Sequence, residues 1–340
     1  MTVLPIALDA MGGDHAPGEI VEGARRAAAD FGIPILLVGR PDELGDTGGL
    51  PVLAASEVIA MDAEPGRSVR TMKDSSLVRA AQAVRDGQAS AMVSAGNTGA
   101  TMASALLRMG RIKGVSRPAI ATPLPRPGMA PNVLLDAGAN AECEPAWLVQ
   151  FGQMGAVFAR DRFGVATPRV GLLSIGEEAG KGSPFVKETF ELMAAADWAT
   201  SCGATFVGNV EGRDLMGDVA DVVVTDGFTG NVALKSMEGA VKAMARALLE
   251  TFADPQYKEA GDALLPALVP LYATFSPETY GGAMLLGVDG VCVISHGSSS
   301  ATAIVNALRV AYEMVTADVV THLRTAVGRS PDPADSPRSA

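Results

Sequence analysis

The chain has 340 residues, 48% of them hydrophobic and 19% charged, which is enough apolar material for one large α/β domain or two smaller ones. Its formal net charge of −11 disfavours nucleic-acid binding, because that function needs a basic surface that displaces counterions. Three scattered cysteines and three histidines without metal-ligand spacing predict reduced thiols in a cytoplasmic protein, with no metal and no bound cofactor. We expect neither a signal peptide nor a membrane span, since no uncharged apolar run reaches about 18 residues.

Short apolar segments alternate with segments of helical periodicity along most of the chain. The expected strands are Pro5–Leu8, Pro34–Val38, Ala91–Val93, Ala119–Thr122, Val133–Leu135, Val170–Leu173, Thr205–Val207, Val222–Val224 and Val291–Ile294. Several are apolar at consecutive positions, as strands buried on both faces are. This alternation predicts an α/β fold with a Rossmann-like, doubly wound and mostly parallel sheet.

The second half of the chain contains a long segment with helical periodicity. It places an apolar face opposite a charged face, with Met237, Val241, Met244 and Leu248 on the first and Lys235, Glu238, Lys242 and Arg246 on the second. We expect one catalytic domain over residues 1–328, with a helical excursion at about Leu249–Tyr280. The segment Arg329–Ala340 is rich in Pro and Ser and is predicted to be a disordered tail.

A polar or glycine-rich segment follows almost every expected strand. These segments contain Asp9, Gly12, Gly13, Asp14 and His15; Ser94, Gly96, Asn97 and Thr98; Asp136 and Asn140; Asn209; Asp226, Thr229 and Asn231; and His296. Since parallel strands end at one edge of a sheet, where open α/β folds bind ligands, we expect these residues to form a site there. Each loop alone also has a simpler explanation, because Gly, Asn and Ser are common in turns and helix caps.

Two of these loops suit an anion such as phosphate. Asp9–Pro17 and Ser94–Gly99 each join a strand to a helix, and their glycines and helix N-terminal N–H groups can approach a ligand closely. Neither has the GxGxxG spacing of a nicotinamide fingerprint, and Gly176–Ser183 has the wrong spacing for a nucleotide-binding P-loop. Lys181 is either a point charge for an anion or a solvated loop lysine. No serine or cysteine lies in a recognisable nucleophile motif, so spacing alone does not identify the reaction.

Two segments bear on partners. Residues 87–135 contain no Asp or Glu but do contain Arg108, Arg111, Lys113 and Arg117, so a basic region can bind an acidic partner or form ordinary surface. Leu264–Phe275 is apolar, contains two prolines and is too short to span a bilayer. It predicts either a dimer interface or shallow contact with a membrane surface. The side chains expected to make that membrane contact are Leu264, Leu265, Leu268, Leu271 and Phe275.

Several stretches, in order along the chain, resemble one family closely. They are ALDAMGGDHAP at residues 7–17, VSAGNTGA at 93–100, RPAIATPLP at 117–125, LLDAGAN at 134–140, PRVGLLSIGEE from 168, FVGNVEGRD at 206–214, DVVVTDGFTGNVALK at 221–235, GGAMLLG at 281–287 and SHGSSS at 295–300. They are similar to the PlsX phosphate acyltransferases of bacterial phospholipid synthesis. DAMGGDHAP and DGFTGN are the most specific of these motifs.

The resemblance implies a homodimer with a fold like that of phosphotransacetylases and isocitrate/isopropylmalate dehydrogenases. It implies the transfer of a long acyl chain from acyl carrier protein to inorganic phosphate, giving acyl-phosphate and free carrier. It also implies peripheral membrane association and a downstream membrane glycerol-phosphate acyltransferase that consumes the product. The basic region then becomes the expected docking surface for the carrier protein.

Phosphate itself can attack the thioester, because a thiol with a pKa of about 8.5 is a fair leaving group. The protein must then bind the anion and stabilise the developing oxyanion. We expect Gly12, Gly13, Ser94, Asn97 and Thr98 to bind phosphate, helped by Lys181. His15 or His296 would polarise the thioester or protonate the leaving sulfur. Asp9, Asp226 and Asn231 would orient the loops, and Asp14, Gly96, Asp136, Asn140, Asn209 and Thr229 would complete the site.

Three other functions fit the sequence. A decarboxylating dehydrogenase of the same broad fold would use a nicotinamide cofactor and a divalent metal, with Asp9, Asp136 and Asp226 as possible ligands. A short-chain phosphotransacylase would act on acyl-CoA instead of a carrier protein. A non-catalytic scaffold would organise lipid enzymes at the membrane surface.

Overall fold

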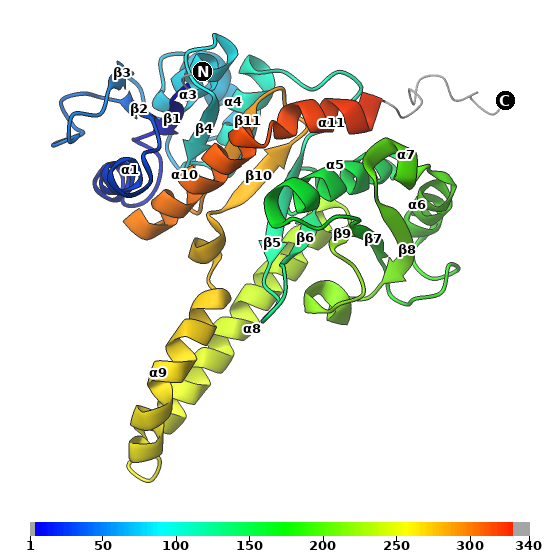
Figure 1. The fold of residues 1–340 in the computed structure, drawn as a ribbon. Coiled ribbons are helices and arrows are strands. Elements are labelled where there is room, and N and C mark those ends of the chain that lie inside the picture. The colour runs from blue at the N-terminus through cyan, green and yellow to red at the C-terminus, as the bar shows by residue number, and fades with distance from the viewer. Residues whose placement is uncertain (1–3, 329–340) are drawn as a thin grey trace.

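The computed structural model describes residues 4–328, whose strands form one eleven-stranded sheet with the order β3-β2-β1-β4-β11-β10-β5-β6-β9-β7-β8 (Figure 1). The strands are β1 (Ile6–Asp9), β2 (Ile35–Gly39), β3 (Val52–Ala54), β4 (Ala91–Ser94), β5 (Ala119–Leu124), β6 (Asn132–Leu135), β7 (Arg169–Leu173), β8 (Thr205–Val210), β9 (Val222–Val224), β10 (Ala283–Leu286) and β11 (Val291–Ile294). Every strand predicted from the sequence overlaps an observed one, and the predicted α/β fold with a mostly parallel sheet is confirmed. The expected tail, residues 329–340, lies outside the described residues.

Helices connect most of the strands. They are α1 (Gly18–Phe31), α2 (Pro65–Thr71), α3 (Ser76–Arg85), α4 (Thr98–Arg108), α5 (Pro145–Phe163), α6 (Pro184–Ala195), α7 (Trp198–Cys202), α8 (Gly227–Ala253), α9 (Lys258–Thr274), α10 (Ala301–Thr316) and α11 (Val319–Gly328), with 3-10 turns η1 (Gly212–Met216) and η2 (Pro277–Tyr280). The core has two parts, one on each face of the sheet. Buried residues of α1, α5, α10 and α11 belong to the first part, and those of α2, α3 and α4 to the second.

The sheet changes direction near its middle. β10 pairs antiparallel with both β11 and β5, and β5 pairs antiparallel with β6. The strands β6, β7, β8 and β9 therefore run opposite to β1, β2, β4 and β11, within which all pairings are parallel. The expectation that all the strand-end loops meet at one edge is wrong for this reason: the loops after β1, β4 and β11 lie at one edge, and those after β6, β7 and β9 at the other.

The second face of the sheet leaves its centre open. On this face α3 packs over β1 and β4, α4 packs against β11, and α8 packs against β6. The strands β5 and β10 lie between these two groups of helices in the sheet order. Side chains of Ile120, Thr122 and Leu124 share one face of β5 because residues two apart in a strand point the same way. These residues form the floor of the cleft described below.

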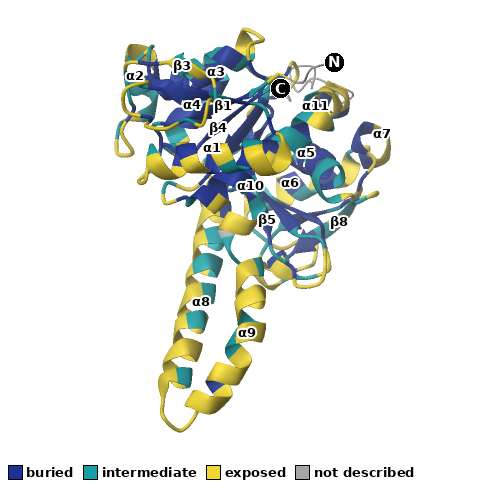
Figure 2. Cartoon of the chain, turned by 60° about the vertical axis from the view of Figure 1, so that its left-hand side comes forward, coloured by how far each residue is buried: buried dark blue, intermediate teal, exposed yellow. Residues whose placement is uncertain are grey.

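The helices α8 and α9 form a long hairpin that projects away from the sheet (Figures 1 and 2). The excursion expected at about Leu249–Tyr280 corresponds to the end of α8, all of α9 and η2, whereas the projecting helix itself begins at Gly227. Beyond its first turns α8 contacts mainly α9, so large apolar side chains such as Met244 (69% exposed) and Leu249 (55% exposed) face outward. Among residues 4–328, no helix has the length and apolar content needed to cross a membrane.

Candidate active site

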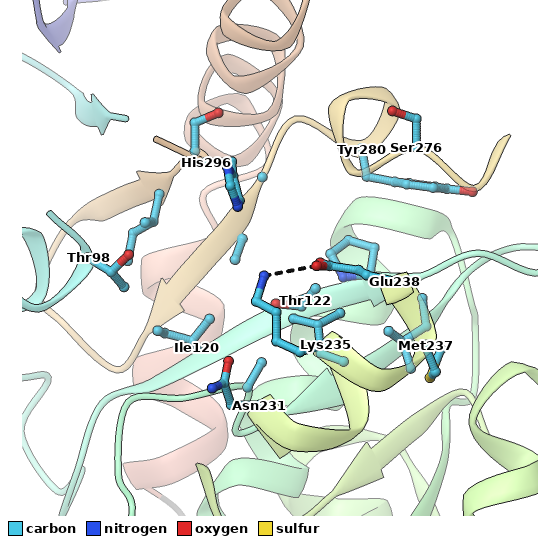
Figure 3. A pocket seen from close by; sticks show the side chains of 18 of the residues that line it. Thr98, Ile120, Thr122, Asn231, Lys235, Met237, Glu238, Ser276, Tyr280 and His296 are labelled. Atoms are coloured by element: carbon cyan, nitrogen blue, oxygen red, sulfur yellow. Dashed lines mark hydrogen bonds and ion pairs between the residues drawn. The ribbon is translucent and has the colours of Figure 1, made fainter. Parts of the chain in front are cut away.

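A cleft of about 430 Å³ opens on the second face of the sheet, between the α2–α4 side and α8 (Figure 3). Its floor consists of Ile120, Thr122 and Leu124 of β5, with Ala283 of β10 and Ile294 of β11 beside them. The loops after β1, β4 and β11 contribute Asp14, Thr98 and His296 to one wall. The end of α9 and η2 contribute Phe275, Ser276 and Tyr280. The cleft therefore joins an apolar floor to a polar rim.

The wall formed by α8 carries the charged residues Lys235 and Glu238, with Asn231 one turn earlier. The Lys235 Nζ lies 2.9 Å from a Glu238 carboxylate oxygen, and the side chains are 50% and 20% exposed respectively. The sequence placed both residues on a helix face opposite the apolar one. Instead, both line the cleft beside apolar Met237 and Val241, because α8 crosses the open centre of the sheet here. Figure 3 shows the Lys235 side chain extending into the cleft toward the side that holds His296.

His296 follows β11 and has a defined tautomer when neutral. Its Nδ1 lies 2.8 Å from the Ser298 hydroxyl and 3.3 Å from the Ser298 backbone nitrogen. Because a backbone N–H can only donate, Nδ1 accepts this hydrogen bond, and the proton of a neutral ring lies on Nε2. The ring lines the cleft, so Nε2–H is a donor available to a bound ligand.

The loops after β1 and β4 are held together by a buried polar group. Asp9 is 2% exposed, and the Ser94 hydroxyl donates to its Oδ2 at 2.8 Å while accepting from Gly96 N at 3.0 Å. Burial raises the pKa of Asp9, and hydrogen bonds, including that from Ser94, partly offset this increase. A Cβ on Gly12 would lie 2.4 Å from Asp9 Oδ2 and 2.9 Å from Gly96 Cα. Glycine at position 12 therefore allows the two loops to pack backbone against backbone.

Gly13 and Asp14 pack against the loop after β11. The Asp14 backbone N–H donates to the Gly297 carbonyl at 2.8 Å, and Gly13 has a φ of +118°, which favours glycine. Asn97 caps α4 by accepting from Ala100 N at 2.9 Å, and its amide donates to the carbonyl of Met61 at 2.7 Å. These contacts place Asp14 and Thr98 at the rim of the cleft, whereas Asp9, Gly12, Ser94 and Gly96 lie behind it.

The predicted residues after β6 and β9 form a second cluster at the opposite sheet edge. Asp136 is fully buried and accepts hydrogen bonds from the backbone N–H groups of Ile120, Ala139 and Asn140. Asp226 caps α8 by accepting from Thr229 N at 2.8 Å and from the Thr229 hydroxyl at 2.7 Å. This cluster fixes the start of α8, and of the predicted residues on this edge only Asn231 lines the cleft.

Other predicted residues lie away from the cleft. His15 is exposed and Lys181 is exposed in the loop after β7, and neither lines the cleft. The Asn209 amide donates to the Glu178 carbonyl at 2.9 Å, so it anchors the loop that carries Lys181. Carboxylate oxygens of Glu177, Glu211 and Asp214 lie within 4.8 Å of one another, as a metal site would require. Arg213 pairs with Glu177 at 2.8 Å and also with Glu211, so this cation compensates part of the group's negative charge.

The four predicted docking residues lie at the far end of α4 and before β5. Arg108 ends α4, whose 11 residues span about 15 Å from Thr98 at the cleft. The Arg111 guanidinium donates to the Ser116 carbonyl, Lys113 is exposed, and the Arg117 guanidinium lies 5.0 Å from the centre of the Trp147 ring. They therefore lie at the sheet edge opposite to His296.

Sequence reasoning missed several residues that line the cleft, including Lys235, Glu238, Tyr280 and Met61. One signal for Lys235 was available. Asn231 lies four residues before Lys235 and Glu238 lies three residues after it, so the three side chains share one side of α8. No comparable signal marks Tyr280 or Met61. Of the predicted membrane contacts, Phe275 lines the cleft, Leu265 and Leu268 are partly buried, and Leu264 and Leu271 are exposed.

The fold resembles solved structures of acyl-transferring and other enzymes. A phosphotransacetylase from Streptococcus pyogenes superposes with a TM-score of 0.61 over 92% of this chain and 94% of its own, at 16% identity. The EutD phosphotransacetylase from Staphylococcus aureus gives a TM-score of 0.59 over the same shares at 16% identity. A 4-hydroxythreonine-4-phosphate dehydrogenase from Klebsiella pneumoniae gives 0.52 at 12% identity, over 92% of this chain and all of its own. At these identities the likeness shows the fold alone.

Sequence relatives are much closer. A family model described as "Fatty acid synthesis protein" matches residues 4–322. A phosphate acyltransferase of Heliobacterium modesticaldum is 49% identical over 91% of this chain and 93% of its own length. A phosphate acyltransferase of Elusimicrobium minutum is 48% identical over 94% of both chains. The chain therefore belongs to the PlsX family of fatty acid synthesis proteins, as the motifs from DAMGGDHAP to SHGSSS had indicated.

Proposed function

We propose that this protein is a phosphate acyltransferase that converts long-chain acyl–[acyl carrier protein] and inorganic phosphate into acyl-phosphate and free carrier protein. The supporting observation is the cleft, which places an apolar floor next to a polar rim formed by three strand-end loops and α8. A phosphate oxygen bonds to the thioester carbonyl carbon, the carbon–sulfur bond breaks, and the thiolate takes a proton. The relatives named phosphate acyltransferase support this reaction.

The apolar and polar residues of the cleft have different roles in this proposal. The acyl chain lies along Ile120 and Leu124, where burial of apolar surface contributes to binding. The His296 Nε2–H donates to the thioester oxygen or to the leaving sulfur. Among the described residues that line the cleft there is no cysteine, in keeping with direct attack by phosphate. His15 and Lys181 stand outside the cleft, so we assign the histidine role to His296.

The central experiment measures free carrier thiol released from long-chain acyl–[acyl carrier protein], with and without inorganic phosphate. We expect release that depends on phosphate, with acyl-phosphate recovered as product. His296→Asn should reduce kcat, whereas His322→Asn serves as a control because His322 bonds to Asp161 away from the cleft. Release only from acyl-CoA would indicate a short-chain phosphotransacylase. No release from either donor would overturn the proposal and leave the scaffold or dehydrogenase hypotheses.

We propose that the carrier protein docks on the basic residues Arg108, Arg111, Lys113 and Arg117. Residues 87–135 contain no acidic side chain, on a chain with a net charge of −11. Such a surface attracts an acidic partner and makes binding salt-dependent. Lys113→Glu should raise KM for the acyl carrier and weaken its salt dependence. An unchanged KM would place the docking surface elsewhere.

We also propose a cytoplasmic homodimer that associates peripherally with the membrane through the α8–α9 hairpin. Exposed Leu264 and Leu271 on α9, together with the outward-facing apolar residues of α8, need a partner surface. Light scattering should give the mass of two chains, and the protein should float with phospholipid vesicles unless Leu264 and Leu271 are changed to Asp. A downstream glycerol-phosphate acyltransferase in the membrane would consume the product. A monomeric mass would contradict the homodimer, and the absence of flotation would contradict the membrane association.

A further inference from the structure

Lys235 is the residue in the cleft best placed to bind an anion. Among the described residues that line the cleft it is the one lysine, and no arginine lines it. Two carboxyl groups, those of Asp14 and Glu238, line the same cleft. Without Lys235, an anion in the cleft would therefore meet only negatively charged or neutral side chains, which disfavours its binding.

The helix N-termini near the cleft are already partly capped by the chain itself, including that of α4, which the sequence suggested as a phosphate site. At α4, Ala100 N is occupied by Asn97 Oδ1 at 2.9 Å. At α10, Ala301 N donates to Glu19 at 2.6 Å, so a negative charge already lies there. The start of α8 is capped by Asp226 in the same way. Carboxylates and an amide of the chain itself thus use N–H groups that a phosphate would need.

We propose that Lys235 binds the inorganic phosphate and that Glu238 competes with phosphate for the Lys235 ammonium group. This inference rests on the proposed function and assigns the phosphate subsite to α8 instead of the glycine-rich loops. An i, i+3 ion pair on a helix is weak, and the Lys235 side chain is half exposed, so a phosphate with several acceptor oxygens can displace Glu238. Asn231, one turn before Lys235 on the same wall, supplies an amide donor.

The test compares variants that change charge at single positions of α8. Lys235→Gln should raise KM for phosphate about tenfold or more, since a charge-assisted hydrogen bond is lost, with KM for the acyl donor nearly unchanged. Glu238→Gln should lower KM for phosphate, because the competing carboxylate is removed. Lys242→Gln is the matched control: it is exposed on the same helix, does not line the cleft, and should change neither constant.

Opposite changes in KM for phosphate from Lys235→Gln and Glu238→Gln would not be produced by a purely structural ion pair. If the wild type shows phosphate-dependent release but Lys235→Gln keeps its KM for phosphate, this inference is wrong while the proposed function stands. Binding of phosphate itself, followed by phosphorus NMR without an acyl donor, tests the inference even if no turnover is found. Binding by wild type and Lys242→Gln but not by Lys235→Gln supports it; equal binding by all three, or none by wild type, overturns it.

Discussion

Replacing Ser94 with Ala should destabilise the protein and impair the cleft together. The Ser94 side chain is fully buried, and it both donates to Asp9 and accepts from Gly96 N. Removing the hydroxyl leaves a buried carboxyl group and a buried backbone N–H each without this partner. At about 1–3 kcal/mol for each group, the expected loss is about 2–6 kcal/mol. With about 2.1 cal/mol/K of unfolding entropy per residue, Tm should fall by about 3–8 °C.

The stability lost in Ser94→Ala should depend on pH in one direction. Burial raises the folded-state pKa of Asp9 above its ordinary 3.8, so its stabilising contribution is present below 3.8 and is lost as the pH rises through the folded pKa. Loss of the Ser94 hydrogen bond should raise this pKa further. The difference in stability between variant and wild type should therefore grow as the pH rises through the raised folded-state pKa of wild-type Asp9.

Thermal and urea unfolding, followed by circular dichroism at several pH values, measure these effects, and thiol release measures the loss of turnover. Ser104→Ala is the matched control, because the buried Ser104 hydroxyl on α4 has no hydrogen-bond partner among the described residues. That substitution should be neutral or slightly stabilising. If Ser94→Ala costs no more than Ser104→Ala, the reasoning about the Asp9 group is refuted.

Three further predictions follow from contacts elsewhere. Burial alone would raise the pKa of Asp221, but hydrogen bonds from Arg169 lower it overall. Asp221→Asn should therefore reduce the free energy of unfolding by about 3–5 kcal/mol. Urea unfolding should show this loss fading as the pH falls through the folded-state pKa of Asp221. Gly230→Ala places a Cβ 1.9 Å from a backbone carbonyl oxygen and should lower both Tm and turnover, whereas Gly239→Ala, which meets nothing within 4 Å, should raise Tm. KM for the acyl donor should fall about fourfold per added methylene until the acyl chain fills the cleft. Ala283→Leu should shorten the chain length at which this trend stops. The same limiting chain length in variant and wild type would contradict binding of the acyl chain in this cleft.

Local patterns in the sequence were sufficient to locate most strands and the family. Each predicted strand is a short apolar run, and a strand buried on both faces needs such a run whatever surrounds it. The two missed strands lack this signal: β3 has three residues and is largely exposed, and β10 follows two glycines within GGAMLLG. The motifs were also readable because they occupy consecutive positions in the chain.

The sequence by itself thus determined the fold class, the family and the residues at the ends of the strands. Only the tertiary structure decided which of those residues share a site. The sheet reverses at the antiparallel β5–β6 pair, and the place of that pair beside β10 depends on pairing between segments more than 150 residues apart, such as Met284 with Ala121. Likewise, helical periodicity groups Lys235 with Glu238, but whether that face meets solvent or substrate depends on the uncovered strand β5 beneath it. Neither fact is encoded in local spacing, because both arise from long-range packing.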